Sequence, residues 1–122
     1  MPAQRAPLRI KAVRWEGKLA TDAARKAAMA AIRQCARDLL AEANDKCPHN
    51  EGTLMRSGVW STDEGTLEGA VSYDTPYAVR LHEHPEYNFQ QGKEGKWLEN
   101  AANRRSQDYL DWISKAIDEA LR

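Results

Sequence analysis

The residues best suited to chemistry are the histidines and the acids beside two of them. The segment from His82 to Glu86 holds two imidazoles and two carboxylates, and His49 is the third histidine of the chain. A zinc-binding helix of the common kind needs two histidines four residues apart, with a glutamate after the first. Here Glu86 occupies the fourth position after His82, and His84 lies about 200° around a helix from His82.

On a helix these two histidines point apart, whereas an extended segment would bring them to one face. One alternative for function is therefore a small metal-dependent hydrolase that uses His82, Glu83 and His84, with His49 as a further ligand. Ordinary surface histidines fit the spacing better than a metal site does. The sequence accordingly predicts a protein that is not an enzyme, with no catalytic residue, no metal and no cofactor.

Other residues with reactive or ligand-binding side chains also lack the spacing that chemistry needs. Neither Ser57 nor Ser61 lies in a Gly-x-Ser-x-Gly turn. Cys35 and Cys47 form no Cys-x-x-Cys pair, so we expect both to be reduced, with Cys35 buried. Residues 92–96 bring glycines, lysines and a helix start together, as phosphate sites do. They lack the Ser or Thr that follows the lysine of a Walker motif, so a plain loop is the favoured interpretation.

The size and composition of the chain are those of one small domain. With 122 residues, of which 42% are hydrophobic, residues 1–122 are expected to form a single domain with one modest core. No apolar run reaches the roughly 18 residues that a membrane span needs. The first residues lack the apolar core of a signal peptide. We therefore expect a soluble protein that is made in a cytoplasm and contacts no membrane.

The charges balance overall but are unevenly placed along the chain. Eighteen basic residues face eighteen acidic ones, which argues against a general nucleic-acid binder, because that function needs an excess of Lys and Arg. Residues 1–18 carry five basic residues against Glu16, a local +4, and residues 51–86 carry two basic residues against seven acids, a local −5. These unlike segments suit head-to-tail contact between copies. An ordinary mixed surface is the alternative.

The N-terminal half contains two periodic patterns. Apolar residues alternate with others from Leu8 to Ala12, which predicts a short strand or an extended arm within residues 1–18. Apolar residues then recur every three or four positions and predict an amphipathic helix over residues 22–46, with alanines on its apolar side. Pro48 should end this helix, because it disfavours helical geometry at the residue before it.

The C-terminal half predicts a hairpin followed by two helices. Alternating residues around a Gly-containing turn indicate a β-hairpin over residues 57–74, with Leu67, Gly69, Val71 and Tyr73 on its apolar face. Thr-Pro at 75–76 should begin a short helix over residues 76–84. Helical periodicity returns over residues 96–121, apart from a polar stretch at 103–106 that we expect to be solvated or to face a partner. The predicted fold class is α+β, with the long N-terminal helix and the C-terminal helix packed on a small antiparallel sheet and a short helix after the hairpin.

The large aromatic residues are of the kinds that protein interfaces favour. Four Trp and four Tyr stand against one Phe, and Trp and Tyr can bury a ring while a polar tip stays hydrated. We expect Trp97 and Trp112 to serve the core. Trp60, Tyr77 and Tyr87 are candidates for contact with a partner.

Several segments, in this order, resemble one known family. They are Cys-Pro at 47–48, Glu-Gly-Thr-Leu-Met-Arg-Ser-Gly at 51–58, Val-Ser-Tyr-Asp-Thr-Pro-Tyr-Ala-Val-Arg-Leu-His-Glu at 71–83, and Gly-Lys-Trp-Leu-Glu-Asn-Ala at 95–101. Their kinds and order are similar to the minor capsid or tail-completion proteins of tailed bacteriophages. The resemblance spans residues 22–121. It implies a helix that closes before a Gly-Thr-Leu motif, a hairpin, and a Lys-aromatic-Leu run that opens the last helix.

The resemblance also implies a function. It indicates a non-enzymatic structural subunit of the head–tail connector, at the neck or in tail completion, that forms or joins a ring at the portal vertex of the virion. Its partners would be copies of itself and other neck, portal-adaptor or tail-tube proteins, with DNA only as cargo through the lumen. A protein-binding adaptor module of another kind is a further alternative.

A ring built by head-to-tail contacts requires two different, complementary patches on each copy. Our hypothesis is that the basic segment before Trp15 meets the acidic hairpin and short helix of a neighbour. The predicted interface residues are Arg9, Lys11, Arg14, Trp60, Tyr77, Arg80, His82, Glu83 and Tyr87.

Overall fold

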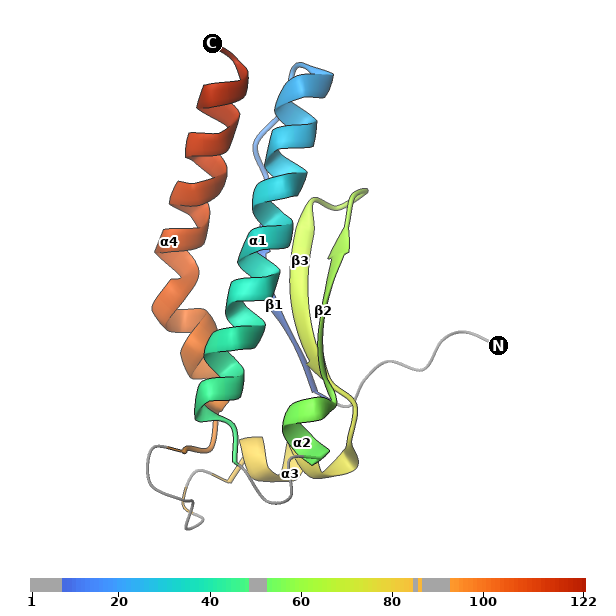
Figure 1. Cartoon of the computed structure of the whole chain (residues 1–122), viewed down its shortest axis with the longest axis vertical. Coiled ribbons are helices and arrows are strands. Elements are labelled where there is room, and N and C mark those ends of the chain that lie inside the picture. Colours follow the sequence, from blue (N-terminus) through green and yellow to red (C-terminus); the bar gives the residue numbers. More distant parts are fainter. Residues whose placement is uncertain (1–7, 49–52, 85, 87–92) are drawn as a thin grey trace, which may run out of the picture.

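Two long helices pack on a small antiparallel sheet, which confirms the predicted α+β class (Figure 1). The computed structural model describes residues 8–48, 53–84, 86 and 93–122. Its elements are β1 (Leu8–Arg14), α1 (Asp22–Lys46), α2 (Thr53–Arg56), β2 (Gly58–Asp63), β3 (Glu68–Tyr73), α3 (Pro76–His82) and α4 (Trp97–Ala120). The single turn α2 was not predicted, and the other elements lie close to the predicted ranges.

The sheet has the order β1-β3-β2, so the second strand of the hairpin is its centre. Both outer strands run antiparallel to β3, so Leu8–Arg14 form a strand of the sheet and not an extended arm. The pairing of β1 shifts between Lys11 and Val13, which marks a bulge at Ala12. Because of the extra residue, Ala12 and Val13 are both buried although they are neighbours in sequence.

The first long helix is defined by its ends. The side-chain oxygen of Thr21 accepts a hydrogen bond from the backbone N–H of Ala24 at 3.0 Å, which caps the start of α1. At the other end Cys47 is extended, with φ −65° and ψ 136°, and Pro48 follows. The alanine-rich side of the helix lies close to the sheet, since a Cβ on Gly69 would come within 3.2 Å of Ala36 Cβ. A glycine in the central strand thus permits the close approach.

The second long helix, α4, packs against α1 and β1. In Figure 1 it lies on the far side of α1 from β2. Arg105 lies in the polar stretch that we expected to be solvated or to face a partner, but its guanidinium binds Glu42 of α1 at 2.5 Å and approaches Asp38 at 3.5 Å. The hydroxyl of Tyr109 donates to the same Asp38 carboxylate at 2.8 Å. These contacts hold α4 against α1, so the polar stretch has an internal role at this residue.

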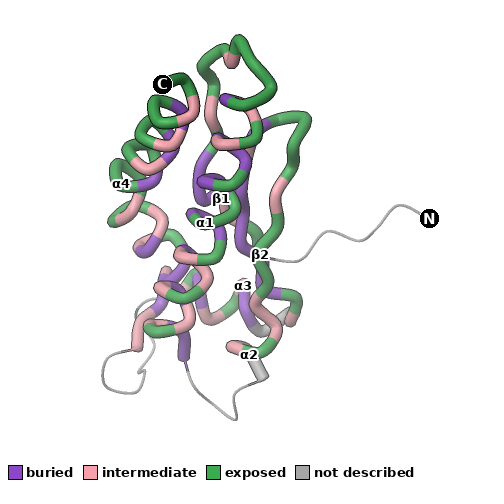
Figure 2. The backbone as a smooth tube through the Cα atoms, turned by 45° about the horizontal axis from the view of Figure 1, so that its top comes forward, coloured by how far each residue is buried: buried purple, intermediate pink, exposed green. Residues whose placement is uncertain are grey.

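The two faces of the sheet differ. The helices cover one face, where Val71 and Tyr73 are buried, and the outward-facing residues of β1 and β2 are exposed (Figure 2). The prediction of one apolar, buried face on β3 was too narrow, because Ala70 and Ser72 on the outward side are buried as well. Ala70 lies between Lys11 and Ser61, and Ser72 lies between Arg9 and Val59.

Candidate functional site

The predicted interface residues do not form one surface. They divide into a sheet group, a group at α3, and one residue outside the described part of the chain. The sheet group is Arg9, Lys11 and Arg14 on β1 with Trp60 on β2, the α3 group is Tyr77, Arg80, His82 and Glu83, and Tyr87 is not among the described residues. The side chain of Tyr77 is also outside the described structure.

The basic residues of β1 line up on the outward face of an edge strand. Arg9 and Lys11 alternate with inward residues, and the bulge at Ala12 restores the same outward direction at Arg14. All three basic side chains are exposed. The ammonium of Lys11 lies 3.3 Å from the Glu68 carboxylate of β3, which neutralises part of the charge within the chain. These residues belong to a folded strand, which agrees with the first of the two predicted alternatives, a short strand or an extended arm.

The opposite edge strand, β2, begins with Gly58, Val59 and Trp60 and ends with three polar residues. Val59 is 55% exposed and Trp60 is 38% exposed. The guanidinium of Arg37 lies 5.9 Å from the centre of the Trp60 ring, a cation–π distance that leaves the ring partly open. Among the described residues β2 pairs only with β3, and that pairing contains no bulge. Proteins usually protect such an edge with charges, proline or a bulge, and β2 has only Asp63 at its end.

The tip of the hairpin carries the acids. Asp63 Oδ1 accepts hydrogen bonds from the backbone N–H groups of Gly65 at 2.8 Å and Thr66 at 3.2 Å, which fixes the turn. The next residue, Glu64, is exposed and its carbonyl accepts a hydrogen bond from Arg25 at 2.9 Å. The Asp63 carboxylate therefore has a defined position at this end of β2, close to the open edge.

The prediction that His82 is a surface residue was wrong. The residue is 1% exposed, and its ring meets the ring of Trp97 edge to face, with ring centres 5.0 Å apart. Its Nε2 accepts the backbone N–H of Glu99 at 3.2 Å, one of the first-turn donors of α4 that have no partner within the helix. His82 therefore acts as a cap for α4 from another helix, and sequence spacing alone does not reveal that role.

The acid next to His82 completes this junction. Since Nε2 of His82 accepts, the ring proton lies on Nδ1, which donates to Glu83 Oε1 at 3.2 Å. The other oxygen of Glu83 accepts from Lys96 Nζ at 2.7 Å. Burial lowers the pKa of His82, and hydrogen bonds from Lys96 and His82 lower the pKa of Glu83. The neutral histidine thus uses both ring nitrogens: Nδ1–H donates to Glu83, and Nε2 accepts from the Glu99 N–H.

This junction predicts a pH-dependent stability. The unfolded chain binds a proton at His82 near pH 6.5, whereas the folded chain does so only at lower pH. The stabilisation is therefore complete above about pH 6.5 and is lost as the pH falls below it. We expect urea unfolding of the protein to show a decline in unfolding free energy between about pH 7 and about pH 5.

The matched variant is His82→Gln, whose side-chain oxygen can accept the Glu99 N–H without titrating. Its unfolding free energy should decline less over the same pH interval. Glu83 remains in both proteins and keeps its hydrogen bond from Lys96, the first cause of its lowered pKa, so most of its contribution is common to the two curves. Equal declines in the two proteins would show that His82 is not the group responsible.

The three histidines of the metal-dependent alternative are not brought together in the described part of the chain. His82 uses both ring nitrogens within the chain, and His84 Nδ1 lies 2.7 Å from Glu86 Oε1. Over the described residues no group of three or more His, Cys, Asp or Glu side chains could hold a metal ion. The third candidate ligand, His49, lies outside the described residues.

The lysines of the phosphate-like loop are engaged with the ends of helices. Lys93 Nζ donates to the backbone carbonyl of Asp45 at 2.8 Å, near the C-terminus of α1. Lys96 precedes α4 and its ammonium pairs with Glu83 and with Glu99, the latter at 3.5 Å. A cation near the last carbonyls of a helix is favourable, so Lys93 has a structural reason for its position.

The cysteines have the character of core residues. Cys35 and Cys47 are both buried and both free. Burial raises the pKa of each thiol to about 12, so neither forms a thiolate readily near neutral pH. Sequence reasoning placed Cys35 in the core correctly.

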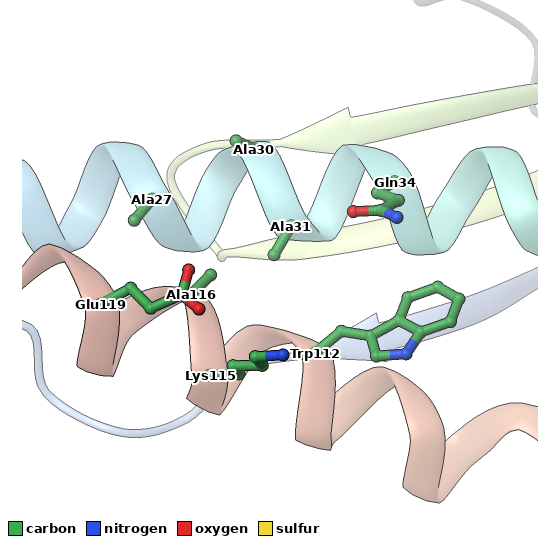
Figure 3. Close-up of a pocket in the computed structure, with 8 residues that line it drawn as sticks. All are labelled: Ala27, Ala30, Ala31, Gln34, Trp112, Lys115, Ala116 and Glu119. Carbon is green, nitrogen blue, oxygen red and sulfur yellow. The ribbon is translucent and has the colours of Figure 1, made fainter.

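Two features of α4 were not identified from the sequence. Leu110 is 39% exposed and Leu121, the residue that follows α4, is 58% exposed; they lie eleven residues apart, about three helical turns, on one side of the helix. On the side facing α1, a groove of about 540 Å³ is lined by residues of both helices, half of them alanines (Figure 3). Trp112 lines this groove and is only half-buried, so its expected place in the core is not fully realised. A search of the sequence for leucines spaced by whole helical turns could have found the pair Leu110 and Leu121.

No described helix is both long enough and apolar enough to cross a membrane. Comparison with protein-family models, with curated proteins and with solved structures finds no significant match.

Proposed function

We propose that this chain is a non-enzymatic structural subunit of the head–tail connector of a tailed bacteriophage, at the neck or in tail completion. In this role it forms or joins a ring at the portal vertex of the virion after synthesis in the host cytoplasm. Its partners are copies of itself and neighbouring neck, portal-adaptor or tail-tube proteins. DNA passes through the lumen as cargo.

The observation that carries this proposal is the contrast between the two edges of the sheet. The β1 edge is basic through Arg9, Lys11 and Arg14, and the β2 edge combines the open Trp60 with the acidic hairpin tip at Asp63. A subunit that joins a ring needs two different patches of this kind. The motif resemblance over residues 22–121 supplies the particular assembly.

The positions of the side chains with catalytic potential also support a structural role. His82 caps α4, Glu83 pairs with Lys96, and the thiols of Cys35 and Cys47 are buried. Each has a structural partner or a place in the core.

The proposal is tested by mixing the purified chain with heads and, separately, with tails produced by the same phage genome. Negative-stain microscopy should then show added density at the portal vertex or at the upper end of the tail. If particles of both kinds look the same with and without the chain, the proposal is wrong. Bovine serum albumin at the same concentration is the control for nonspecific decoration.

A further inference from the structure

We propose that the open edge of β2 in one copy docks beside β1 of a second copy, under the exposed leucines of that copy's α4. This inference rests on the proposed assembly function and names the contact through which copies join. The partner is a second copy of the same chain. In this head-to-tail arrangement each copy uses its β2 edge to contact one neighbour and its β1 edge to contact the other.

The two edge strands are able to pair. Within the described residues β1 and β2 each bond only to β3, so each presents one free row of backbone N–H and C=O groups. Since both run antiparallel to β3, they run parallel to each other. A second copy placed beside the first in the same orientation would therefore continue the sheet with a parallel pair.

The register within the chain shows which residues would meet. Arg14 and Asp63 both pair with Glu68, so they lie at one level of the sheet on opposite edges. Likewise Ile10 and Trp60 both pair with Val71. An unstaggered continuation of the sheet would place Arg14 of one copy beside Asp63 of the next.

The same continuation would place Ile10 beside the next copy's Trp60, on the face that the helices cover. Opposite charges and an aromatic beside a β-branched residue are both favourable cross-strand pairs. On the outward side Lys11 would lie beside the next copy's Ser61, because both residues pair with Ala70. The two edges are thus complementary in charge at one end and in apolar surface along the middle.

The exposed apolar residues fall on the two flanks that this contact joins. The large exposed hydrophobic side chains among the described residues are Val59, Trp60, Leu110 and Leu121. Two belong to β2. The other two share a face of α4 with Ile117, which is buried in the core cluster, and α4 packs against β1.

Helix α4 lies beyond α1 on the side away from β2 (Figure 1). It therefore stands at the β1 flank, where the β2 strand of a second copy would arrive. Its exposed leucines can cover that strand's Trp60, which its own helices leave partly open. In the described part of the chain, the β1 flank has exposed leucines without a partner strand beneath them, and the β2 flank has a tryptophan that its own helices leave partly exposed. Because one chain carries both surfaces, a second copy is favoured over an unrelated partner.

The contact can be tested by disulfide trapping. Lys11→Cys and Ser61→Cys are made in separate chains, since both positions are exposed and face outward at one level. Within one chain they are two strand spacings apart, roughly 9.5 Å, too far for a disulfide, which needs Cα atoms within about 7 Å. The native Cys35 and Cys47 are buried and should not react.

An equal mixture of the two variants, oxidised at concentrations up to about the millimolar range, should yield a disulfide-linked heterodimer on non-reducing gels, and each variant alone should yield much less. A chain that carries both substitutions should form a ladder of linked copies. As a control, Ser61→Cys is mixed with Lys115→Cys, because Lys115 lines the groove on another side of α4.

Three results would overturn this inference. They are a homodimer of Ser61→Cys alone as the main product, which indicates a two-fold β2–β2 contact; equal yields with the Lys115→Cys control; or no linked product with a monomeric mass by light scattering. None of these affects the test with heads and tails, so a failure of the contact and a failure of the proposed function can be told apart.

Discussion

Replacing Trp97 with alanine is expected to remove about 3–5 kcal/mol of unfolding free energy. The side chain is fully buried at the point where α4 begins, and its ring contacts Tyr73 and His82 edge to face, with ring centres 5.6 Å and 5.0 Å away. The truncation would leave a cavity where α3, α4 and the end of β3 meet. For a domain whose total stability is about 5–15 kcal/mol, this is a large part of the whole. Urea denaturation followed by far-UV circular dichroism measures the loss.

Trp97→Phe is the matched control, because phenylalanine keeps an aromatic ring in the same place. It should cost roughly 1–2 kcal/mol. An alanine variant as stable as the phenylalanine variant would show that the junction can collapse around the missing ring, and that the packing described for Trp97 does not govern the stability of this end.

Replacing Trp60 with threonine is expected to weaken association between copies at least tenfold, which corresponds to about 1.4 kcal/mol. Trp60 is partly open in the single chain, and the proposed contact buries its ring beneath the α4 of a neighbour. Threonine keeps the strand propensity, so the single chain should stay folded with a loss of about 1–2 kcal/mol at most. Sedimentation velocity over a range of concentrations measures the change in association.

Val59→Thr is the control on the same strand. Val59 is more exposed than Trp60 but faces the opposite side of the sheet, away from the helices. Its substitution should weaken association much less. Equal effects of the two substitutions, or none at Trp60, would contradict a contact made through the helix-covered side of the strand.

Much of the fold could be predicted because its elements carry local signals. Thr21 begins α1 with a cap, Pro48 follows its end, and alternation around the turn after Asp63 defines the hairpin. These signals depend on residues a few positions apart, which a sequence displays directly. They led to the correct α+β class.

The candidate site was less accessible to sequence reasoning because its properties arise from distant contacts. His82 looked like a surface residue, yet it is buried because Trp97, fifteen positions later, and the Glu99 N–H lie against it. Arg105 lies in a polar stretch, and only the packing of α4 on α1 brings it to Glu42. Similarly, the order β1-β3-β2 decides which strands are edges, and local periodicity does not encode that order.

The most direct test of the proposed function is gradient sedimentation of the chain with heads and with tails from the same phage genome. We expect wild-type protein to move with one kind of particle and to reach saturation as its concentration rises, and Trp60→Thr to need a higher concentration for the same occupancy. Wild-type protein that stays at the top of the gradient with both kinds of particle, at every concentration, would contradict a role in the head–tail connector.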